Sequence, residues 1–186
     1  MANSKKSVEE IADLRIFDNW LDAEDFQKVK DLFYHADTTW NIVPGISASD
    51  STNAIKNPLN NYMFTHGIYG NYEPRSNAFN QIIDIFHNKL YQDEGMDFTS
   101  VWRMKTNLYP RTEELQEHPY HTDYNLGRMR GALLMLNTCD GYTGFADGTQ
   151  VDSVENRCVL FDATKKHHST NCTNDQFRMT LNVNYI

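Results

Sequence analysis

The segment EHPYHTDYN, residues 117–125, places His121 and Asp123 two positions apart. In an extended strand the side chains of residues i and i+2 leave on the same face of the chain. An imidazole nitrogen and a carboxylate oxygen can therefore be directed at one point, a donor pair that suits a divalent transition metal. The H-x-D motif is short, so a metal site also needs a third ligand from elsewhere in the chain.

A candidate third ligand lies near the C-terminus, where two histidines are adjacent, His167 and His168. The following segment FRMTLNVNY, residues 177–185, alternates between polar and apolar residues, which is typical of a strand. A polar strand face this late in the chain is expected to line a cavity. Buried arginine is costly unless it meets an anion, and its planar guanidinium suits a carboxylate. The polar residues that share this face are Arg178, Thr180, Asn182 and Asn184.

Two histidines and one carboxylate are the facial triad of non-haem Fe(II) oxygenases. The triad leaves three coordination positions open, enough for a bidentate 2-oxo acid and O₂. Arg178 would then hold the far carboxylate of the acid. The alternative is a cupin-like module that binds a metal or ligand without turnover. Such a module does not need a basic residue ten positions after the distal histidine, so Arg178 favours the oxygenase.

The first half of the chain is predicted to be mainly helical. Residues 14–21 read as a short strand and a turn, and residues 22–36 as an amphipathic helix with Asp22 as its N-cap. A second helix is predicted over residues 77–91. Residues 41–76 have no sustained period, so we expect loops with one short strand at most, which help to build the mouth of a pocket.

The second half changes to short strands separated by Gly, Asp and Asn turns. Helices followed by strands favour an antiparallel sandwich or barrel flanked by helices. A doubly wound α/β fold would need the two kinds of element to alternate, and they do not. The predicted strands cover residues 98–109, 129–137, 148–154, 157–163 and 177–185.

Composition limits the class of protein. The chain has 186 residues, 40% of them hydrophobic and 23% charged, which fits one soluble domain over residues 1–186. A formal charge of −8 makes nucleic-acid or membrane-surface binding an improbable main task. No apolar run approaches the ~20 residues of a membrane helix. The N-terminus has two lysines without an apolar stretch behind them, so a cytoplasmic location is expected.

The three cysteines are Cys139, Cys158 and Cys172. Their number is odd, their spacing is wide, and none forms a CxxC pair. A disulfide framework or zinc knuckle is therefore not expected. We predict small buried or half-buried thiols instead.

Four segments, taken in order, resemble the 2-oxoglutarate- and Fe(II)-dependent dioxygenases, especially the prolyl 4-hydroxylase-like branch. LRIFDNWLDAEDFQKVKDL is similar to that branch's opening strand and helix, and MKTNLYPRTEELQEHPYHTD to its strand with a tyrosine, a loop and H-x-D. LLMLNTCDGYTGFADG is similar to Leu-Asn followed by Gly-Gly-x-Thr, although the second glycine is Tyr142 here. RCVLFDATKKHHS resembles the strand before the distal histidine.

This resemblance implies a fold and a set of site residues. The fold would be α+β with a mainly β core, a double-stranded β-helix (jelly roll, cupin-like) with flanking N-terminal helices. Residues 1–95 would give helical support and loops, and residues 96–186 the jelly-roll core. The iron ligands would be His121, Asp123 and His168, with His168 preferred to His167 because it lies ten residues before Arg178. The 2-oxoglutarate C5 carboxylate would be bound by Arg178, Tyr109 and Thr180.

The resemblance also implies the reaction. Fe(II), 2-oxoglutarate and O₂ would hydroxylate a peptidyl substrate, prolyl peptides among them, or a small molecule, with release of succinate and CO₂. Arg103 is a candidate for the pocket wall, while Tyr124 and Asn125 follow the H-x-D motif and are candidates for substrate contact. His118 is expected in a surface loop, with a place behind the metal ligands as the alternative.

Overall fold

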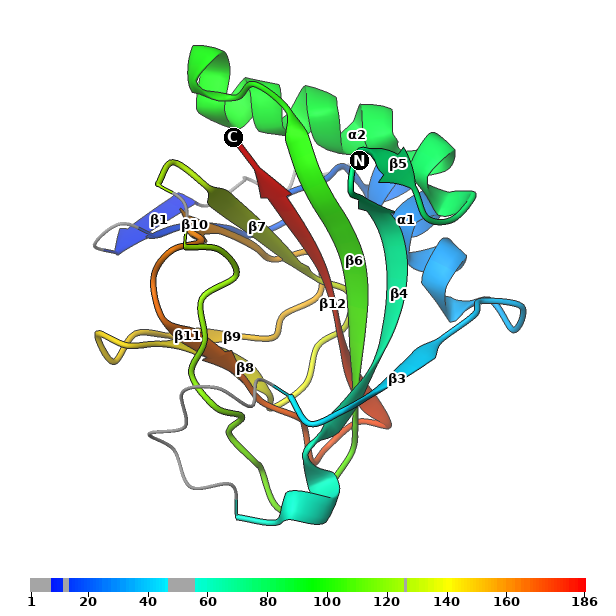
Figure 1. Cartoon of the computed structure of the whole chain (residues 1–186), viewed down its shortest axis with the longest axis vertical. Coiled ribbons are helices and arrows are strands. Elements are labelled where there is room, and N and C mark those ends of the chain that lie inside the picture. The colour runs from blue at the N-terminus through cyan, green and yellow to red at the C-terminus, as the bar shows by residue number, and fades with distance from the viewer. Residues whose placement is uncertain (1–7, 12–13, 47–55, 126) are drawn as a thin grey trace.

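The computed structural model describes residues 8–11, 14–46, 56–125 and 127–186. Two antiparallel sheets dominate this part of the chain (Figure 1). Figure 1 shows the two helices on one side of the large sheet and the small sheet on its other side. In the large sheet the strands follow the order β1 (Val8–Ile11), β2 (Leu14–Phe17), β10 (Cys158–Asp162), β7 (Arg130–Met135), β12 (Phe177–Tyr185), β6 (Val101–Pro110), β4 (Tyr62–Gly70) and β3 (Asn41–Pro44), and β5 (Glu73–Pro74) pairs with β4. The small sheet has the order β11 (His167–Ser169), β8 (Tyr142–Phe145) and β9 (Gln150–Asp152).

Two helices cover the outer face of the large sheet, as the apolar spacing predicted. Helix α1 (Ala23–Tyr34) begins after Asp22, whose carboxylate accepts a hydrogen bond from the Asp25 amide at 2.9 Å. Helix α2 (Ala78–Glu94) runs three residues further than predicted and ends where Gly95 takes a φ of 62°. Short 3₁₀ turns, η1 (Pro58–Asn60) and η2 (Gly95–Asp97), complete the helical elements described.

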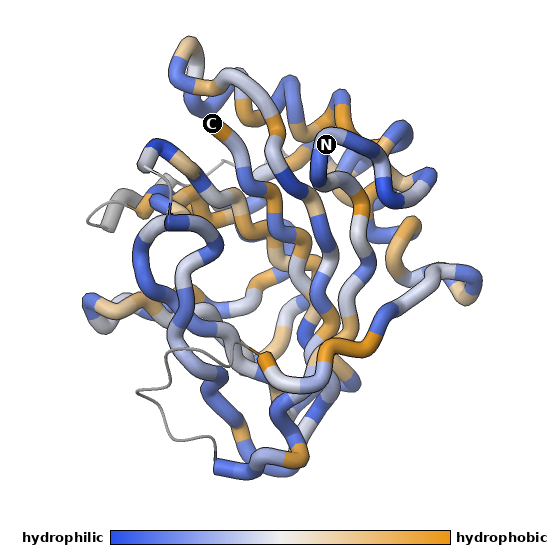
Figure 2. The backbone as a smooth tube through the Cα atoms, viewed as in Figure 1, coloured by the Kyte–Doolittle hydropathy of each residue, from blue (hydrophilic) through white to orange (hydrophobic). Residues whose placement is uncertain are grey.

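Strand β12 has one apolar face and one polar face, as the alternation in its sequence predicted. Its apolar side chains join the core beneath the helices, together with residues such as Phe86 and Leu90 of α2. A second apolar cluster, which includes Phe145 and Phe161, lies between the two sheets. Figure 2 shows the resulting mixture of hydrophobic and hydrophilic positions along the central strands. The apolar residues of β12 are Met179, Leu181, Val183 and Tyr185.

The loop prediction for residues 41–76 is wrong over β4, which forms ladder pairs with β6 from Phe64↔Leu108 onward. Only Ile68 of this strand is fully buried, and a register shift lies between Gly67 and Tyr69. Half-buried positions and a bulge remove the alternation by which a strand is recognised. The described residues of the first half of the chain therefore contribute the five strands β1 to β5 as well as helices.

In the small sheet, the prediction of a strand over residues 148–154 is confirmed by β9, whereas β8 and β11 were missed. Strand β8 has four residues and β11 has three, too few for any period to be visible. Cys139, Cys158 and Cys172 are free and buried, as expected. In the part of the chain that the structure describes, no helix has the length and apolar character needed to cross a membrane.

The core packing leads to a stability prediction with a matched control. Leu181→Ala removes a side chain that is 0% exposed, and it should lower the free energy of unfolding by about 2–5 kcal/mol through lost burial and the cavity left behind. Leu59→Ala, at a position 84% exposed, should change it by less than about 0.5 kcal/mol. Urea unfolding followed by circular dichroism measures both, and equal effects would contradict the packing described.

Candidate metal centre

A reciprocal backbone pair joins the H-x-D segment to β11. The amide of His121 donates to the carbonyl of His167 at 2.9 Å, and the amide of His167 donates to the carbonyl of His121 at 2.9 Å. Residues that exchange both hydrogen bonds are directly opposed, so their side chains leave on the same face. The amide of Asp123 donates to Ala163 at 3.1 Å, which continues the contact on the other side of the motif.

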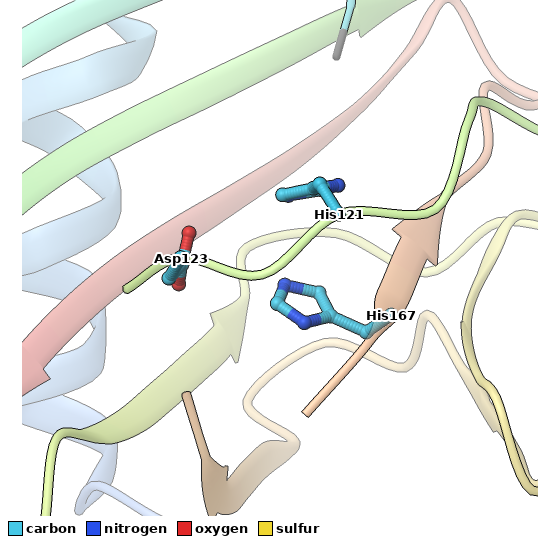
Figure 3. A group of neighbouring side chains, drawn as sticks. All are labelled: His121, Asp123 and His167. Carbon is cyan, nitrogen blue, oxygen red and sulfur yellow. The ribbon is translucent and has the colours of Figure 1, made fainter. Parts of the chain in front are cut away.

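The side chains of His121, Asp123 and His167 converge as a result (Figure 3). One ligand atom from each lies within 4.8 Å of the others, and we call this group the candidate triad. Nδ1 of His167 lies 3.0 Å from the Lys165 carbonyl, and Nδ1 of His121 lies 3.4 Å from the Pro119 carbonyl. A carbonyl can only accept, so Nδ1 carries the proton and Nε2 keeps a free lone pair. Both rings thus offer Nε2 to a metal.

The carboxylate of Asp123 is held in place from both sides. Oδ1 accepts from Arg103 Nη2 at 3.0 Å, and Oδ2 accepts from the amides of Asn182 and Asn184 at 3.1 and 3.0 Å. These bonds use three of the roughly four lone-pair sites of a carboxylate, so one remains for a metal.

Charges around the candidate triad favour the forms that bind metal. Burial by itself raises the pKa of Asp123, but the His167 ring, Arg103 and Lys105 lower it below its ordinary value. Arg103 and Lys105 keep their charge when His167 offers Nε2 to a metal, so the carboxylate stays ionised. Burial, followed by the neighbouring His167, lowers the pKa of His121 to about 4. His121 is therefore neutral at pH 7, as a metal-binding imidazole must be.

His168, the histidine that the sequence favoured, lies outside the candidate triad. Successive residues of β11 point to opposite faces, so His167 and Ser169 line the cavity while His168 points away. His168 packs on Gly144, where an added Cβ would be 2.2 Å from its Nε2, and its ring lies 4.7 Å from that of Tyr120. The ten-residue spacing to Arg178 thus favoured His168, whereas its neighbour His167 joins the candidate triad.

A cavity of about 270 Å³ lies between the sheets and contains the candidate triad on its wall. Its floor is a polar ladder, the inward-facing residues of β6 and β12 that pair in register as Tyr109↔Arg178, Asn107↔Thr180, Lys105↔Asn182 and Arg103↔Asn184. Arg178, Tyr109 and Thr180 therefore line the same cavity as the candidate triad, and Arg103 faces it too. Lys105 and Asn107 were missed, although the alternation of VWRMKTNLYP places them on the face of Tyr109.

Arg178 is fully buried at one end of the polar ladder. It donates to the Thr143 hydroxyl at 2.7 Å and to the Thr170 carbonyl at 3.2 Å, and its guanidinium lies 5.6 Å from the centre of the Tyr109 ring. Gly141 permits this position, since an added Cβ would be 2.6 Å from Arg178 Cδ. Burial lowers the pKa of Arg178, a measure of the cost of the buried charge.

Among the residues that the structure describes, no carboxylate forms an ion pair with the guanidinium of Arg178. Its Nε and the hydroxyl of Thr180 are buried without a hydrogen-bond partner in this part of the chain. A buried cation with an unused donor is costly, and an anionic ligand would offset that cost. This end of the cavity therefore fits an anion.

His118 was expected on the surface, and this prediction is wrong. The side chain is 0% exposed, its Nδ1 lies 2.9 Å from the Ser169 hydroxyl, and its ring stacks on Tyr109 with centroids 5.4 Å apart. Burial, followed by Arg178, lowers the pKa of His118 to about 3, so the ring is neutral at pH 7. It lies behind Tyr109, a buried place that is closer to the alternative left open for His118 than to a surface loop.

The remaining candidates lie around the cavity. Tyr124 lies under Arg103, with the guanidinium 5.1 Å from the ring centre, and Asn125 is exposed and accepts from the Thr122 hydroxyl at 2.8 Å. Tyr142, the departure from the glycine motif, is accommodated within β8, and its amide donates to the Thr170 hydroxyl at 2.8 Å.

Comparison with known proteins gives structural neighbours only. No family model matches the chain, and no curated protein does. A prolyl hydroxylase from Trichoplax adhaerens, solved with a hypoxia inducible factor peptide fragment, is 17% identical with a TM-score of 0.63, over 94% of this chain and 83% of that one. A 2OG-Fe(II) oxygenase family oxidoreductase from Burkholderia pseudomallei is 10% identical with a TM-score of 0.64, over 93% and 84%.

A viral collagen prolyl hydroxylase from Paramecium Bursaria Chlorella virus-1 is 10% identical with a TM-score of 0.58, over 93% of this chain and 95% of that one. At such identities the likeness concerns the fold. The mainly β architecture with two helices on one face agrees with the fold that the sequence predicted. The chain therefore has the double-stranded β-helix fold of the solved 2OG-Fe(II) oxygenases.

Proposed function

We propose that this protein is an Fe(II)- and 2-oxoglutarate-dependent dioxygenase that hydroxylates a peptidyl or small-molecule substrate. One observation carries the proposal. The same cavity holds the candidate triad of His121, Asp123 and His167 and, at the end of its polar ladder, the buried Arg178 without an anionic partner among the described residues. A metal-binding module without turnover needs the triad but has no need of that arginine.

The donor set of the triad fits ferrous iron. Two imidazole nitrogens and one carboxylate oxygen are the ligands of non-haem Fe(II) oxygenases. We assign the ligand positions to Nε2 of His121, Nε2 of His167 and one oxygen of Asp123, with His167 in place of His168. Arg103, Asn182 and Asn184 orient the carboxylate, a role for which groups around a metal site are commonly retained.

The other end of the cavity fits one carboxylate of 2-oxoglutarate. Arg178 Nε and the Thr180 hydroxyl are the unused polar groups there, and Tyr109 lies against the same guanidinium. A diacid bound at Arg178 would extend along β12 toward the level of Asn182, where Asp123 is held. Its second carboxylate and keto oxygen would then reach the metal.

Bound iron and 2-oxoglutarate would supply O₂ activation and substrate oxidation, with succinate and CO₂ as products. The protein contributes position and electrostatics. Arg103 and Lys105 favour the ionised form of Asp123, and burial keeps His121 neutral. The cavity, about 270 Å³, is slightly smaller than the roughly 300–1,000 Å³ of typical ligand sites. It suits the cosubstrate and the reacting group, while the rest of a substrate stays outside.

The substrate class rests on the neighbours. The Trichoplax enzyme was solved with a peptide fragment and the viral enzyme is a collagen prolyl hydroxylase, which supports a peptidyl substrate, prolyl peptides among them. Small molecules stay within the proposal. A cytoplasmic location and a single domain over residues 1–186 are part of it too.

The first test is a spectroscopic titration. Anaerobic addition of Fe(II) and 2-oxoglutarate should produce the weak visible charge-transfer band of a chelated 2-oxo acid. A cupin-like module that binds metal alone would bind Fe(II) without developing the band. That result would overturn the proposed function.

The second test separates the two adjacent histidines. His167→Ala should weaken Fe(II) binding by more than about 100-fold, since a direct ligand contributes more than the 10–100-fold of an orienting neighbour. His168→Ala should bind Fe(II) within about tenfold of the wild type, although loss of packing on Gly144 should lower its melting temperature. Equilibrium dialysis and circular dichroism give the two readouts. Loss of iron binding in His168→Ala but not in His167→Ala would show that His168 is the ligand, as the sequence favoured.

The third test concerns the cosubstrate. Arg178→Ala should weaken 2-oxoglutarate binding by roughly 10- to 150-fold, because a charge-assisted hydrogen bond contributes about 1.5–3 kcal/mol. Arg111→Ala removes an exposed arginine outside the cavity lining and should leave that affinity unchanged. Titration of the charge-transfer band measures both, and an unchanged affinity in Arg178→Ala would transfer the role to another residue.

A further inference from the structure

Lys105 is a cation of the cavity whose only part in the proposed site is its electrostatic effect on Asp123. It lies on β6 opposite Asn182, whose amide holds Asp123, so it stands at the metal end of the polar ladder. The side chain lines the cavity and is partly exposed to it. Within the described part of the chain, its ammonium donates no hydrogen bond and forms no ion pair. The neighbouring Arg103, in contrast, is occupied by Asp123 and by Asn184, each at 3.0 Å.

The charges of the cavity do not balance once it is loaded. Its lining carries three cations, Arg103, Lys105 and Arg178, and one carboxylate, Asp123. Bound Fe(II) and doubly ionised 2-oxoglutarate cancel each other in formal charge. The loaded cavity therefore keeps an excess of two positive charges, and partly buried charges of one sign are costly unless a counter-charge arrives.

This excess is local. The whole chain has a formal charge of −8, so a general basic character does not explain a cationic cavity. Burial, followed by Arg103, lowers the pKa of Lys105 to about 8, and the attraction of Asp123 offsets this only in part. An anion beside the ammonium would reduce the excess positive charge of the cavity and raise the pKa of Lys105.

We infer that Lys105 forms a second anion subsite, next to the metal, which binds a carboxylate of the primary substrate. This inference rests on the proposed function and narrows its substrate class. The substrate would be a small organic acid, or a peptide that presents an acidic side chain or its C-terminal carboxylate at the cavity. Asn182 is paired with Lys105 on the neighbouring strand and donates a hydrogen bond to Asp123. A substrate carboxylate bound to Lys105 would therefore set the distance between the substrate and the metal. Neutral analogues would lose this positioning.

The test compares Lys105→Met with Lys28→Met. Methionine keeps the apolar stem and removes the charge, and Lys28 is an exposed residue of α1 that supplies the same charge change away from the cavity. Acetate, the simplest carboxylate probe, is titrated by calorimetry into anaerobic protein loaded with Fe(II) and saturating 2-oxoglutarate. The wild type and Lys28→Met should bind acetate with equal, millimolar affinity. Lys105→Met should bind it at least tenfold more weakly. Absence of acetate binding to the wild type, or equal binding to Lys105→Met, would overturn the inference.

A second measurement excludes a role of Lys105 toward the cosubstrate. The 2-oxoglutarate affinity of Lys105→Met is taken from the charge-transfer band at saturating Fe(II), so that a weaker metal affinity through Asp123 does not enter it, and it should then stay within threefold of the wild type. A loss of tenfold or more would assign Lys105 to 2-oxoglutarate and overturn the substrate subsite. If the wild type forms the band and fails only with acetate, this inference falls while the proposed function stands. If the band never forms, the proposed function falls, and the acetate titration of iron-free protein still tests Lys105.

Discussion

The candidate site depends on one backbone interaction, the two hydrogen bonds exchanged by His121 and His167. They fix the register between the H-x-D segment and β11, so the two imidazoles face each other across a pair of opposed residues. A shift of one residue would turn His167 away and bring His168 inward, because the side-chain period of a strand is two. The pairing of β11 with β8, where Gly144 leaves room for the ring of His168, stabilises the observed register from the other side.

The second constraint is that the two faces of β12 have different environments. Its apolar face forms the core beneath the helices, while its polar face is the floor of the cavity. Buried polar atoms normally find partners, and unpaired ones cost about 1–3 kcal/mol each. Several unpaired atoms gather on the polar ladder, namely Asn107 Oδ1, Arg178 Nε, Thr180 Oγ1 and Asn182 Oδ1. Their concentration around one cavity indicates a site shaped for polar ligands. Burial of the apolar face of β12 offsets the free energy that these unpaired groups cost.

The sequence predicted what depends on local periods. Both helices and β12 follow from spacings of 3.6 and 2, and the shared direction of His121 and Asp123 follows from the i, i+2 rule. What it missed depends on pairing between distant strands. The choice between His167 and His168 requires the register with His121, and the burial of His118 requires the stacking with Tyr109. Strand β4 was missed because its bulge and half-buried residues hide any period.

The electrostatics of the cavity link these features. Positive charge from Arg103 and Lys105 keeps Asp123 ionised against the effect of burial, and this is a condition for binding a metal. The same charge must be tolerated when no ligand is bound, and neutral neighbours make that easier. His118 and His121 both have pKa values far below 7, so neither adds a further charge at neutral pH. The cavity thus combines neutral imidazoles with fixed cations. This combination favours a divalent metal only together with anionic ligands, because an unaccompanied dication would add to the charge already present.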